Sequence, residues 1–321
     1  MTIVVFGSIN MDFVAQVPRL PQPGETITGE QFSTLPGGKG ANQAVAVARL
    51  GAACELIGRV GADSFGAALV QHLQAAGVDC AQVIRDATTS SGAAMIEVSA
   101  GRSGAQRPGD NHIVVIPGAN GNVGEADIAR LAACLPRASW LLLQLEVPLP
   151  AVVAAARAAT AVGVKVMLDP APARSLPAEL YATVDVITPN QTEAEQLTGF
   201  PVQTLESAAR AADWFQRQGV TTAAITLGTG GVFYQSAGEA RAVPAFSVPA
   251  VDTVAAGDTF NGALAVALSR QLPFSEAVRY GAAAAAIAVT RSGAQTSIPT
   301  HAEVESFLSQ HKASPTLDRN L

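Results

Sequence analysis

An aspartate that follows three small residues is the strongest candidate for chemistry in this chain of 321 residues. In the stretch DTVAAGDTFNGAL, residues 252–264, Asp258 comes directly after Ala255, Ala256 and Gly257. If a helix starts near Gly257, the amides of residues 255–258 are unpaired and the helix dipole adds partial positive charge, which suits an anion. A helix cap alone would explain the acid, but the small residues leave room for a bulky anion. An aspartate beside a phosphoryl group can accept a proton from an attacking hydroxyl, so the stretch predicts phosphoryl transfer.

A glycine-rich turn, GGKGAN at residues 37–42, precedes a second helix-like run. It fails the phosphate-loop pattern because Lys39 is followed by Gly40 and not by Ser or Thr. The stretch GSIN after the first strand has a single glycine, so a dinucleotide fingerprint is also missing. Lys39 and Asn42 on exposed backbone suit a polyhydroxylated small molecule, and a plain glycine turn is the alternative.

Polar residues also end several strand-like runs: Glu146, Asp169, Asn190 and the TLGTGG turn at 226–231. Ligands of an open parallel sheet bind outside the carboxyl ends of its strands, so these residues are candidates for one common edge. Asn190 and Glu193, three residues apart, fit a helix capping box and also a site for a metal-bound phosphate. The spacing alone does not choose between the two.

The order of elements predicts an α/β fold. Continuous apolar runs alternate with helical patterns from residue 139 onward, which is typical of a parallel sheet covered on both faces. The segments at about 13–36 and 91–118 alternate apolar and polar residues and predict a small antiparallel lid, with a long hairpin tip at 99–111. We expect a single domain over residues 1–311 and a disordered tail at 312–321.

The composition excludes several classes of protein. A net charge of −6 without a basic stripe argues against nucleic-acid binding. Apolar runs fall short of the roughly 18 residues that a membrane span needs, and no basic region precedes the first strand as in a secretory signal. The histidines lack metal-ligand spacing, so no zinc site is expected. The cysteines have no CxxC spacing, which indicates free thiols in a cytoplasmic protein: Cys54, Cys80 and Cys134.

Two of these stretches together resemble a known family. GGKGAN near the N-terminus and DTVAAGDTFNGAL near the C-terminus are similar to the two signatures of the ribokinase family of carbohydrate and nucleoside kinases. Stretches such as GSINMD at 7–12, PGET at 23–26 and ITPNQTEAEQLTG at 187–199 match in the same order, and the resemblance covers about residues 3–310. It implies a three-layer α/β/α domain with a small β lid that phosphorylates the 5-hydroxyl of D-ribose with ATP.

The resemblance also implies roles for individual residues. Asp258 would be the catalytic base, with Ala255, Ala256 and Gly257 as the anion hole. Asp258 would also contact the sugar, together with Asn10, Met11, Asp12, Gly38, Lys39, Gly40, Ala41, Asn42 and Glu146. Gly257 and Asp258 would meet the nucleotide, together with Asn190, Thr226, Leu227, Gly228, Thr229, Gly230 and Gly231. Glu193 would hold Mg²⁺ through water, and K⁺ would lie near Asp252, Val254, Ala288, Arg291, Gly293 and Ser297.

Two departures from the family pattern affect these expectations. Ala282 stands where related kinases can carry a histidine near the adenine, and the tip at 99–111 is longer than the family pattern leads us to expect. Exposed edges of the lid strands favour a homodimer through the lid. The alternatives are a kinase for deoxyribose, fructose or adenosine, and a catalytically silent sugar-binding module. A nicotinamide dehydrogenase has little support without the fingerprint.

Overall fold

The main sheet has nine strands in the order β13-β12-β11-β10-β9-β8-β1-β4-β5. The computed structural model describes residues 2–101, 111–236 and 238–311, so the predicted tail at 312–321 and most of the tip at 99–111 lie outside the described residues. The seven strands from β11 to β5 in this spatial order are all parallel to their neighbours, and β12 and β13 are added antiparallel at the other edge. The strands are β1 Thr2–Phe6, β4 Ala53–Gly61, β5 Val83–Asp86, β8 Ala138–Leu143, β9 Lys165–Leu168, β10 Val186–Ile187, β11 Thr222–Thr226, β12 Val232–Ser236 and β13 Glu239–Val243.

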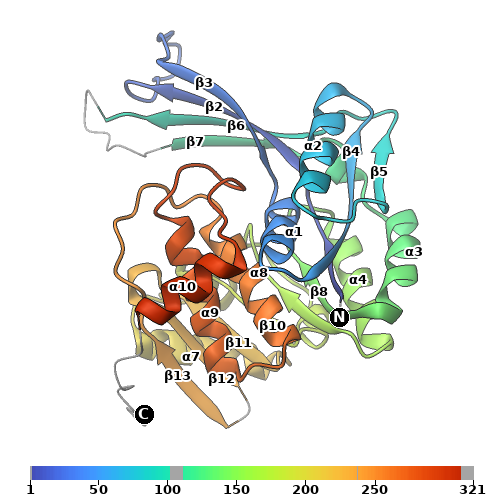
Figure 1. Ribbon diagram of the computed structural model, residues 1–321, viewed down its shortest axis with the longest axis vertical. Coiled ribbons are helices and arrows are strands. Elements are labelled where there is room, and N and C mark those ends of the chain that lie inside the picture. The colour runs from blue at the N-terminus through green and yellow to red at the C-terminus, as the bar shows by residue number, and fades with distance from the viewer. Residues whose placement is uncertain (1, 102–110, 237, 312–321) are drawn as a thin grey trace.

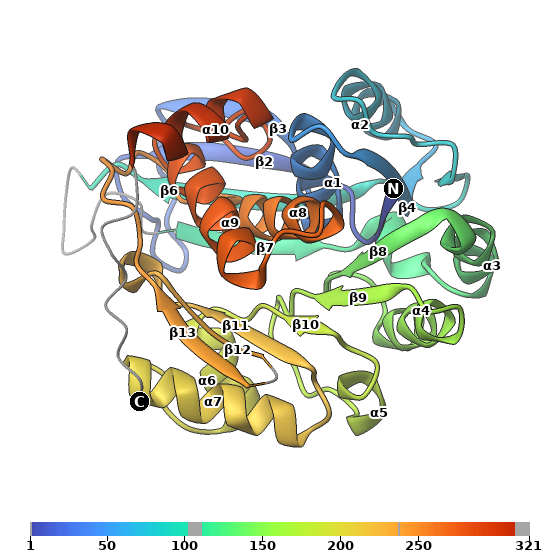
Figure 2. The same ribbon diagram turned by 60° about the horizontal axis from the view of Figure 1, so that its bottom comes forward.

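Helices cover both faces of this sheet (Figure 2). One apolar core includes residues of α1, α2, α8, α9 and α10, and a second core includes residues of α3 to α7. The predicted three-layer fold is therefore confirmed. The helices are α1 Lys39–Arg49, α2 Ser64–Ala75, α3 Glu125–Cys134, α4 Leu149–Ala161, α5 Ala178–Tyr181, α6 Gln191–Thr198, α7 Leu205–Arg217, α8 Ala256–Ser269, α9 Phe274–Ala288 and α10 His301–Gln310, with short 3₁₀ turns η1 Gly118–Asn122, η2 Leu135–Arg137 and η3 Gly228–Gly230. None of the helices within the described ranges is long and apolar enough to cross a bilayer.

Close packing of α1 on α8 brings the two candidate stretches together. A Cβ atom added at Gly262 of α8 would lie 2.5 Å from the Cβ of Ala46 on α1. The glycine therefore lets the two backbones approach closely, as its small size allows. Because GGKGAN leads into α1 and DTVAAGD leads into α8, this contact places both at the same side of the sheet.

The lid is a four-stranded sheet that projects from one end of the body (Figure 1). Its strands are β3 Gln31–Gly37, β2 Asn10–Val17, β6 Gly92–Ser99 and β7 Asn111–Ile116, in spatial order. The outer pairs are antiparallel as predicted, while the central pair of β2 with β6 is parallel. The alternating pattern was wrong beyond Val17, because residues 18–30 form no strand. Prolines in that segment cannot donate to a ladder: Pro18, Pro21 and Pro23.

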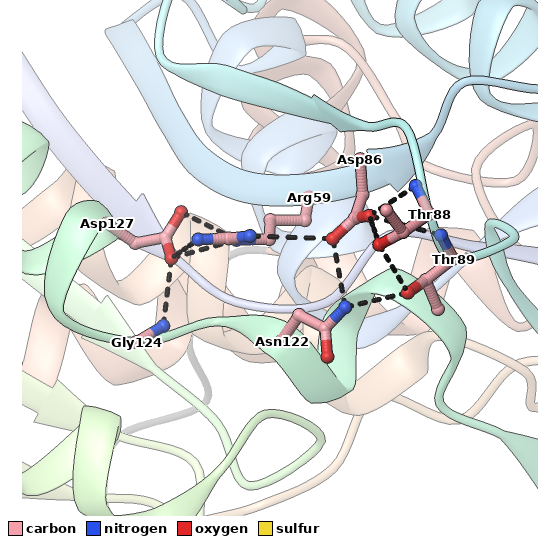
Figure 3. Close-up of polar contacts among 7 residues, drawn as sticks. All are labelled: Arg59, Asp86, Thr88, Thr89, Asn122, Gly124 and Asp127. Atoms are coloured by element: carbon pink, nitrogen blue, oxygen red, sulfur yellow. Dashed lines mark hydrogen bonds and ion pairs between the residues drawn. The ribbon is translucent and has the colours of Figure 1, made fainter.

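A polar network ties the two chain segments that join β5 to β6 and β7 to α3 (Figure 3). Asn122 donates to Asp86 at 2.9 Å and to Thr89 at 2.8 Å, so both lid connections are held to each other. Arg59 of β4 lies between Asp86 and Asp127, with its closest contact a 2.8 Å ion pair to the fully buried Asp127. The arginine thus joins β4 to the end of β5 and to α3, next to the two connections that lead to and from the lid.

Candidate active site

The carboxylate of Asp258 lies in the first turn of α8 and is 5% exposed. Its Oδ2 accepts a hydrogen bond from the side-chain amide of Asn42 at 2.9 Å, and its Oδ1 accepts one from Gln43 at 3.2 Å. Both donors are on α1, which packs against α8. The candidate base is therefore held at a fixed rotation by two amides, each on one oxygen.

The backbone before Asp258 provides donors and space. Ala255 has a left-handed conformation, with φ of 57°, which turns the chain into α8. The prediction that all four amides are free is wrong at Ala256, whose amide donates to the carbonyl of Thr253 at 3.3 Å. Within the described residues, the amides of Ala255, Gly257 and Asp258 donate to no protein acceptor. No atom lies within 4 Å of a Cβ added at Gly257, so an anion has room beside these amides.

The GGKGAN turn places Lys39 at the first position of α1. Gly38 has a φ of +89°, and a Cβ there would lie 2.7 Å from the amide nitrogen of Asn10, so glycine is needed for the turn and for the approach to β2. The amide of Lys39 donates to Glu146 Oε2 at 3.1 Å, and the hydroxyl of Ser8 donates to the same oxygen at 2.6 Å. Ser8 is not among the predicted site residues, because a serine within GSIN carries no local signal.

The side chain of Lys39 is surrounded by acidic groups. Burial lowers the pKa of its ammonium group, but the charges of Asp258, Asp169, Glu146 and Glu193 outweigh burial and raise the pKa. The structure thus brings together acids from four strand ends or helix starts, as the common-edge prediction required. Lys39 remains protonated and supplies the positive charge of the site.

Two side chains of β2, Asn10 and Asp12, complete the part of the site that is predicted to contact the sugar. Burial, together with the charges of Glu146 and Asp258, raises the pKa of Asp12 to about 7. The Oδ1 atom of Asn10 accepts a hydrogen bond from the buried Asn120 at 2.7 Å, and Asn120 also bonds both backbone groups of Ile9. Asn120 lies in η1, and sequence reasoning missed it because its partners are 110 and 111 positions away.

The candidate nucleotide positions lie at the ends of β10 and β11. Asn190 caps α6, and the capping box is confirmed: the amide of Glu193 donates to Asn190 Oδ1 at 2.9 Å, and the amide of Asn190 donates to Glu193 Oε2 at 2.8 Å. A backbone bridge joins Asn190 to Thr226, so the 226–231 turn is beside the cap. Burial raises the pKa of Glu193, although the Asn190 amide and Lys39 oppose the rise.

Five of the six candidate potassium positions lie on two neighbouring turns, and the sixth, Ala288, is the last residue of α9. Asp252 Oδ2 accepts from the amide of Gly293 at 2.9 Å, and Val251 donates to the carbonyl of Val289 at 2.7 Å. The guanidinium of Arg291 is directed at Glu303, at 2.6 Å. The other candidates on these turns are Val254 and Ser297, while Ala282 is half-buried within α9.

Known proteins resemble this chain over most of its length. A family model for pfkB family carbohydrate kinases matches residues 1–301. The chain belongs to this family. Among the curated members of the family, the ribokinase of Haemophilus influenzae is 45% identical over 307 residues, which is 96% of this chain and 98% of the relative. A deoxyribokinase of Salmonella typhimurium is 36% identical over 96% of this chain and 99% of its own length. The structure of Arabidopsis thaliana ribokinase complexed with ribose and ATP is 33% identical, with a TM-score of 0.87 over 97% of this chain and 99% of that chain.

Proposed function

We propose that this pfkB family member transfers the terminal phosphoryl group of ATP to the 5-hydroxyl of D-ribose, giving ribose 5-phosphate and ADP. The observation that carries the proposal is Asp258, held by Asn42 and Gln43, beside the free amides of Gly257 and of Asp258 itself. A proton acceptor, anion donors and space for a phosphoryl group then lie within one helix turn. The ribokinases among the relatives and solved structures support ribose as the sugar.

The residues around Asp258 have complementary parts in this reaction. The 5-hydroxyl donates its proton to Asp258 as its oxygen attacks the phosphorus in line with the leaving oxygen of ADP. The free amides of Ala255, Gly257 and Asp258 stabilise the charge on the transferred group. Asn42 and Lys39 are donors to the sugar hydroxyls, while Asp12 and Glu146 are acceptors; Asn10, Met11, Gly38, Gly40 and Ala41 line the same subsite. A site built for hydroxyls discriminates against sugars that lack them.

The nucleotide and its metal fit the residues at the ends of β10 and β11. We assign ATP to Asn190, residues 226–231 and Gly257. Only Oε2 of Glu193 is bound by the Asn190 amide, so its other oxygen can accept from water around Mg²⁺, the hard oxygen ligation that this ion prefers. When bound, Mg²⁺ neutralises charge on the phosphates. The role of Ala282 at the adenine stays a prediction.

The two turns near α8 fit a monovalent cation. Asp252 joins the turn that contains Val254 to the turn that follows Ala288. Its Oδ1 accepts from the Val254 amide at 3.0 Å, and its Oδ2 accepts from the amide of Gly293. The carboxylate thereby orders the loop immediately before the anion hole. K⁺ bound by carbonyls of these turns would stiffen that loop.

The second candidate substrate is deoxyribose, because two Salmonella deoxyribokinases are 36% identical over 96% of this chain. Coupled measurement of ADP release over ribose, deoxyribose, fructose and adenosine separates the candidates. Ribose is expected to give the highest kcat/KM. Turnover of another compound in preference to ribose refutes the proposed substrate, and absence of turnover on the whole panel favours a silent sugar-binding module.

Substitution of the base provides the test of mechanism. Asp258→Asn is expected to lower kcat by about 10²- to 10⁴-fold, the usual contribution of a general base, while calorimetry still detects ribose and ATP binding. Asp213→Asn, an exposed aspartate on α7, is the matched control and should retain wild-type turnover. Unchanged turnover of Asp258→Asn would remove Asp258 from the mechanism.

The lid surface supports assembly of two copies. Four successive apolar residues of the edge strand β7 are 45–61% exposed: Ile113, Val114, Val115 and Ile116. An exposed apolar edge strand is a ready surface for pairing, so we infer a homodimer through the lid, working in the cytoplasm where ATP is available. A mass of one chain by light scattering, at the protein concentration of the activity assay, would refute the dimer.

A further inference from the structure

The side-chain amide of Gln43 connects two buried carboxylates. Gln43 is on α1 and is 1% exposed. Its Nε2 atom donates to Asp169 Oδ2 at 2.9 Å and to Asp258 Oδ1 at 3.2 Å. Each of the two N–H groups of the amide therefore has one carboxylate as its acceptor.

The orientation of this amide is fixed by its surroundings. Gln43 Oε1 accepts a hydrogen bond from Gln144 Nε2 at 2.6 Å. A flipped amide would place its donors against the Nε2 donor of Gln144 and its oxygen against Asp258, which has no proton to donate when it is ready to act as the base. The donors of Gln43 can therefore face only the two acids.

Asn42 and Gln43 act on different oxygens of the base. Asn42 holds Oδ2 and is itself held by Gln295 at 3.1 Å. Gln43 holds Oδ1 from the buried side, among protein atoms, so a sugar in the site cannot contact it. Each oxygen of Asp258 keeps one further lone pair for a substrate proton.

We propose that Gln43 is the positioning residue of the catalytic base: its amide fixes the rotation of the Asp258 carboxylate and favours the ionised form that accepts the proton. The inference rests on the proposed function, because it assumes that Asp258 is the base. An amide donor stabilises a carboxylate relative to the carboxylic acid. Without that donor, Asp258 is protonated at a higher pH and its free lone pair is no longer aimed at the substrate hydroxyl.

The test compares Gln43→Met, which keeps the length of the side chain and removes the donors, with the wild-type enzyme. We measure kcat, KM for the sugar and the pH dependence of kcat, using the sugar that the wild-type enzyme turns over best. The expected result is a fall in kcat of about 10- to 100-fold, a KM within about 3-fold of wild type, and an acid limb of the kcat profile that moves to higher pH. A role in folding alone would not move that limb.

Two further variants make the test decisive. Gln43→Glu keeps the shape but adds negative charge beside both acids, so its acid limb should move further than that of Gln43→Met. Gln216→Met changes a half-buried glutamine on α7, away from the site, and should match the wild-type profile. If either soluble Gln43 variant keeps the wild-type kcat or the wild-type acid limb, the inference is overturned.

The outcomes also separate this inference from the proposed function. If the wild-type enzyme prefers another sugar, ribose specificity fails, and the shifted acid limb measured with that sugar still supports the role of Gln43. If Asp258→Asn retains full turnover, the base assignment fails and the inference about Gln43 fails with it.

Discussion

Removal of the charge at Asp12 is expected to stabilise the folded protein while weakening sugar binding. Asp12 lies on β2 with Glu146 and Asp258 nearby, and burial with these two charges raises its pKa from 3.8 to about 7. No hydrogen bond to its carboxylate is present among the described residues that would be lost on substitution. Asp12→Asn therefore removes an unfavourable charge at little structural cost.

The size and sign of the effect follow from proton linkage. A folded-state pKa of about 7 against 3.8 in the unfolded chain means that the folded protein binds more protons between these pH values, so the free energy of unfolding falls as pH rises through this window. A difference of about three pKa units at roughly 1.4 kcal/mol each gives about 4 kcal/mol by pH 8. Well below pH 3.8 the charge at Asp12 contributes nothing, because the carboxyl is protonated in both states.

Urea unfolding of the wild-type protein and of Asp12→Asn between pH 4.5 and 8 provides the assay. The variant should gain stability over the wild type progressively up to about pH 7 and then keep a constant advantage. Its affinity for ribose should fall about tenfold or more, since a carboxylate acceptor for sugar hydroxyls is lost. Stability curves that stay parallel over the whole pH range would refute the electrostatic reasoning.

Two further predictions concern the support of the site. Gly37→Ala places a Cβ 2.1 Å from Asp12 Oδ2, so this carboxylate must rotate away, and calorimetry should show roughly tenfold weaker ribose binding with little loss of stability; an unchanged Kd would contradict this. Arg59→Leu leaves the fully buried Asp127 without its ion-pair partner and should lower the free energy of unfolding by about 3 kcal/mol. Arg157→Leu, which breaks an exposed ion pair, is the control and should cost less than about 1 kcal/mol; equal losses for the two variants would refute the importance of burial.

The parts of the fold that sequence predicted are those with strong local patterns. The runs at 139–146 and 222–228 are continuous and apolar, and they form the buried strands β8 and β11. The lid strands show alternation, which β2 keeps only as far as Val17. The strands β4 and β5 were not assigned, although β4 pairs with β1 inside the sheet and β5 forms the edge beside it.

The candidate site was predictable only where a short motif carried it. Asp258, Lys39 and Asn42 lie in recognisable stretches, and the structure places them around one point. Gln43 and Asn120 have no such signal, because their partners are 215 and 110 positions away and only the packed fold brings them together. Asp169 had a signal as a strand-end acid, but its partner Gln43 is 126 positions away. The left-handed Ala255 was also unpredictable, since alanine rarely adopts that conformation.

The acidic surroundings of Lys39 have a consequence for how the nucleotide enters. Four carboxylates act on this single ammonium group, and burial keeps the pKa of Asp169 and Glu193 above its ordinary value. At a given pH these two acids are therefore protonated to a greater extent than free carboxylic acids, and cationic charge arriving beside them favours release of those protons. A nucleotide arriving with its metal should release protons to the buffer, while the metal-free polyphosphate meets net repulsion. Cation supply and pH, as much as the concentration of ATP itself, then determine how readily the pocket fills.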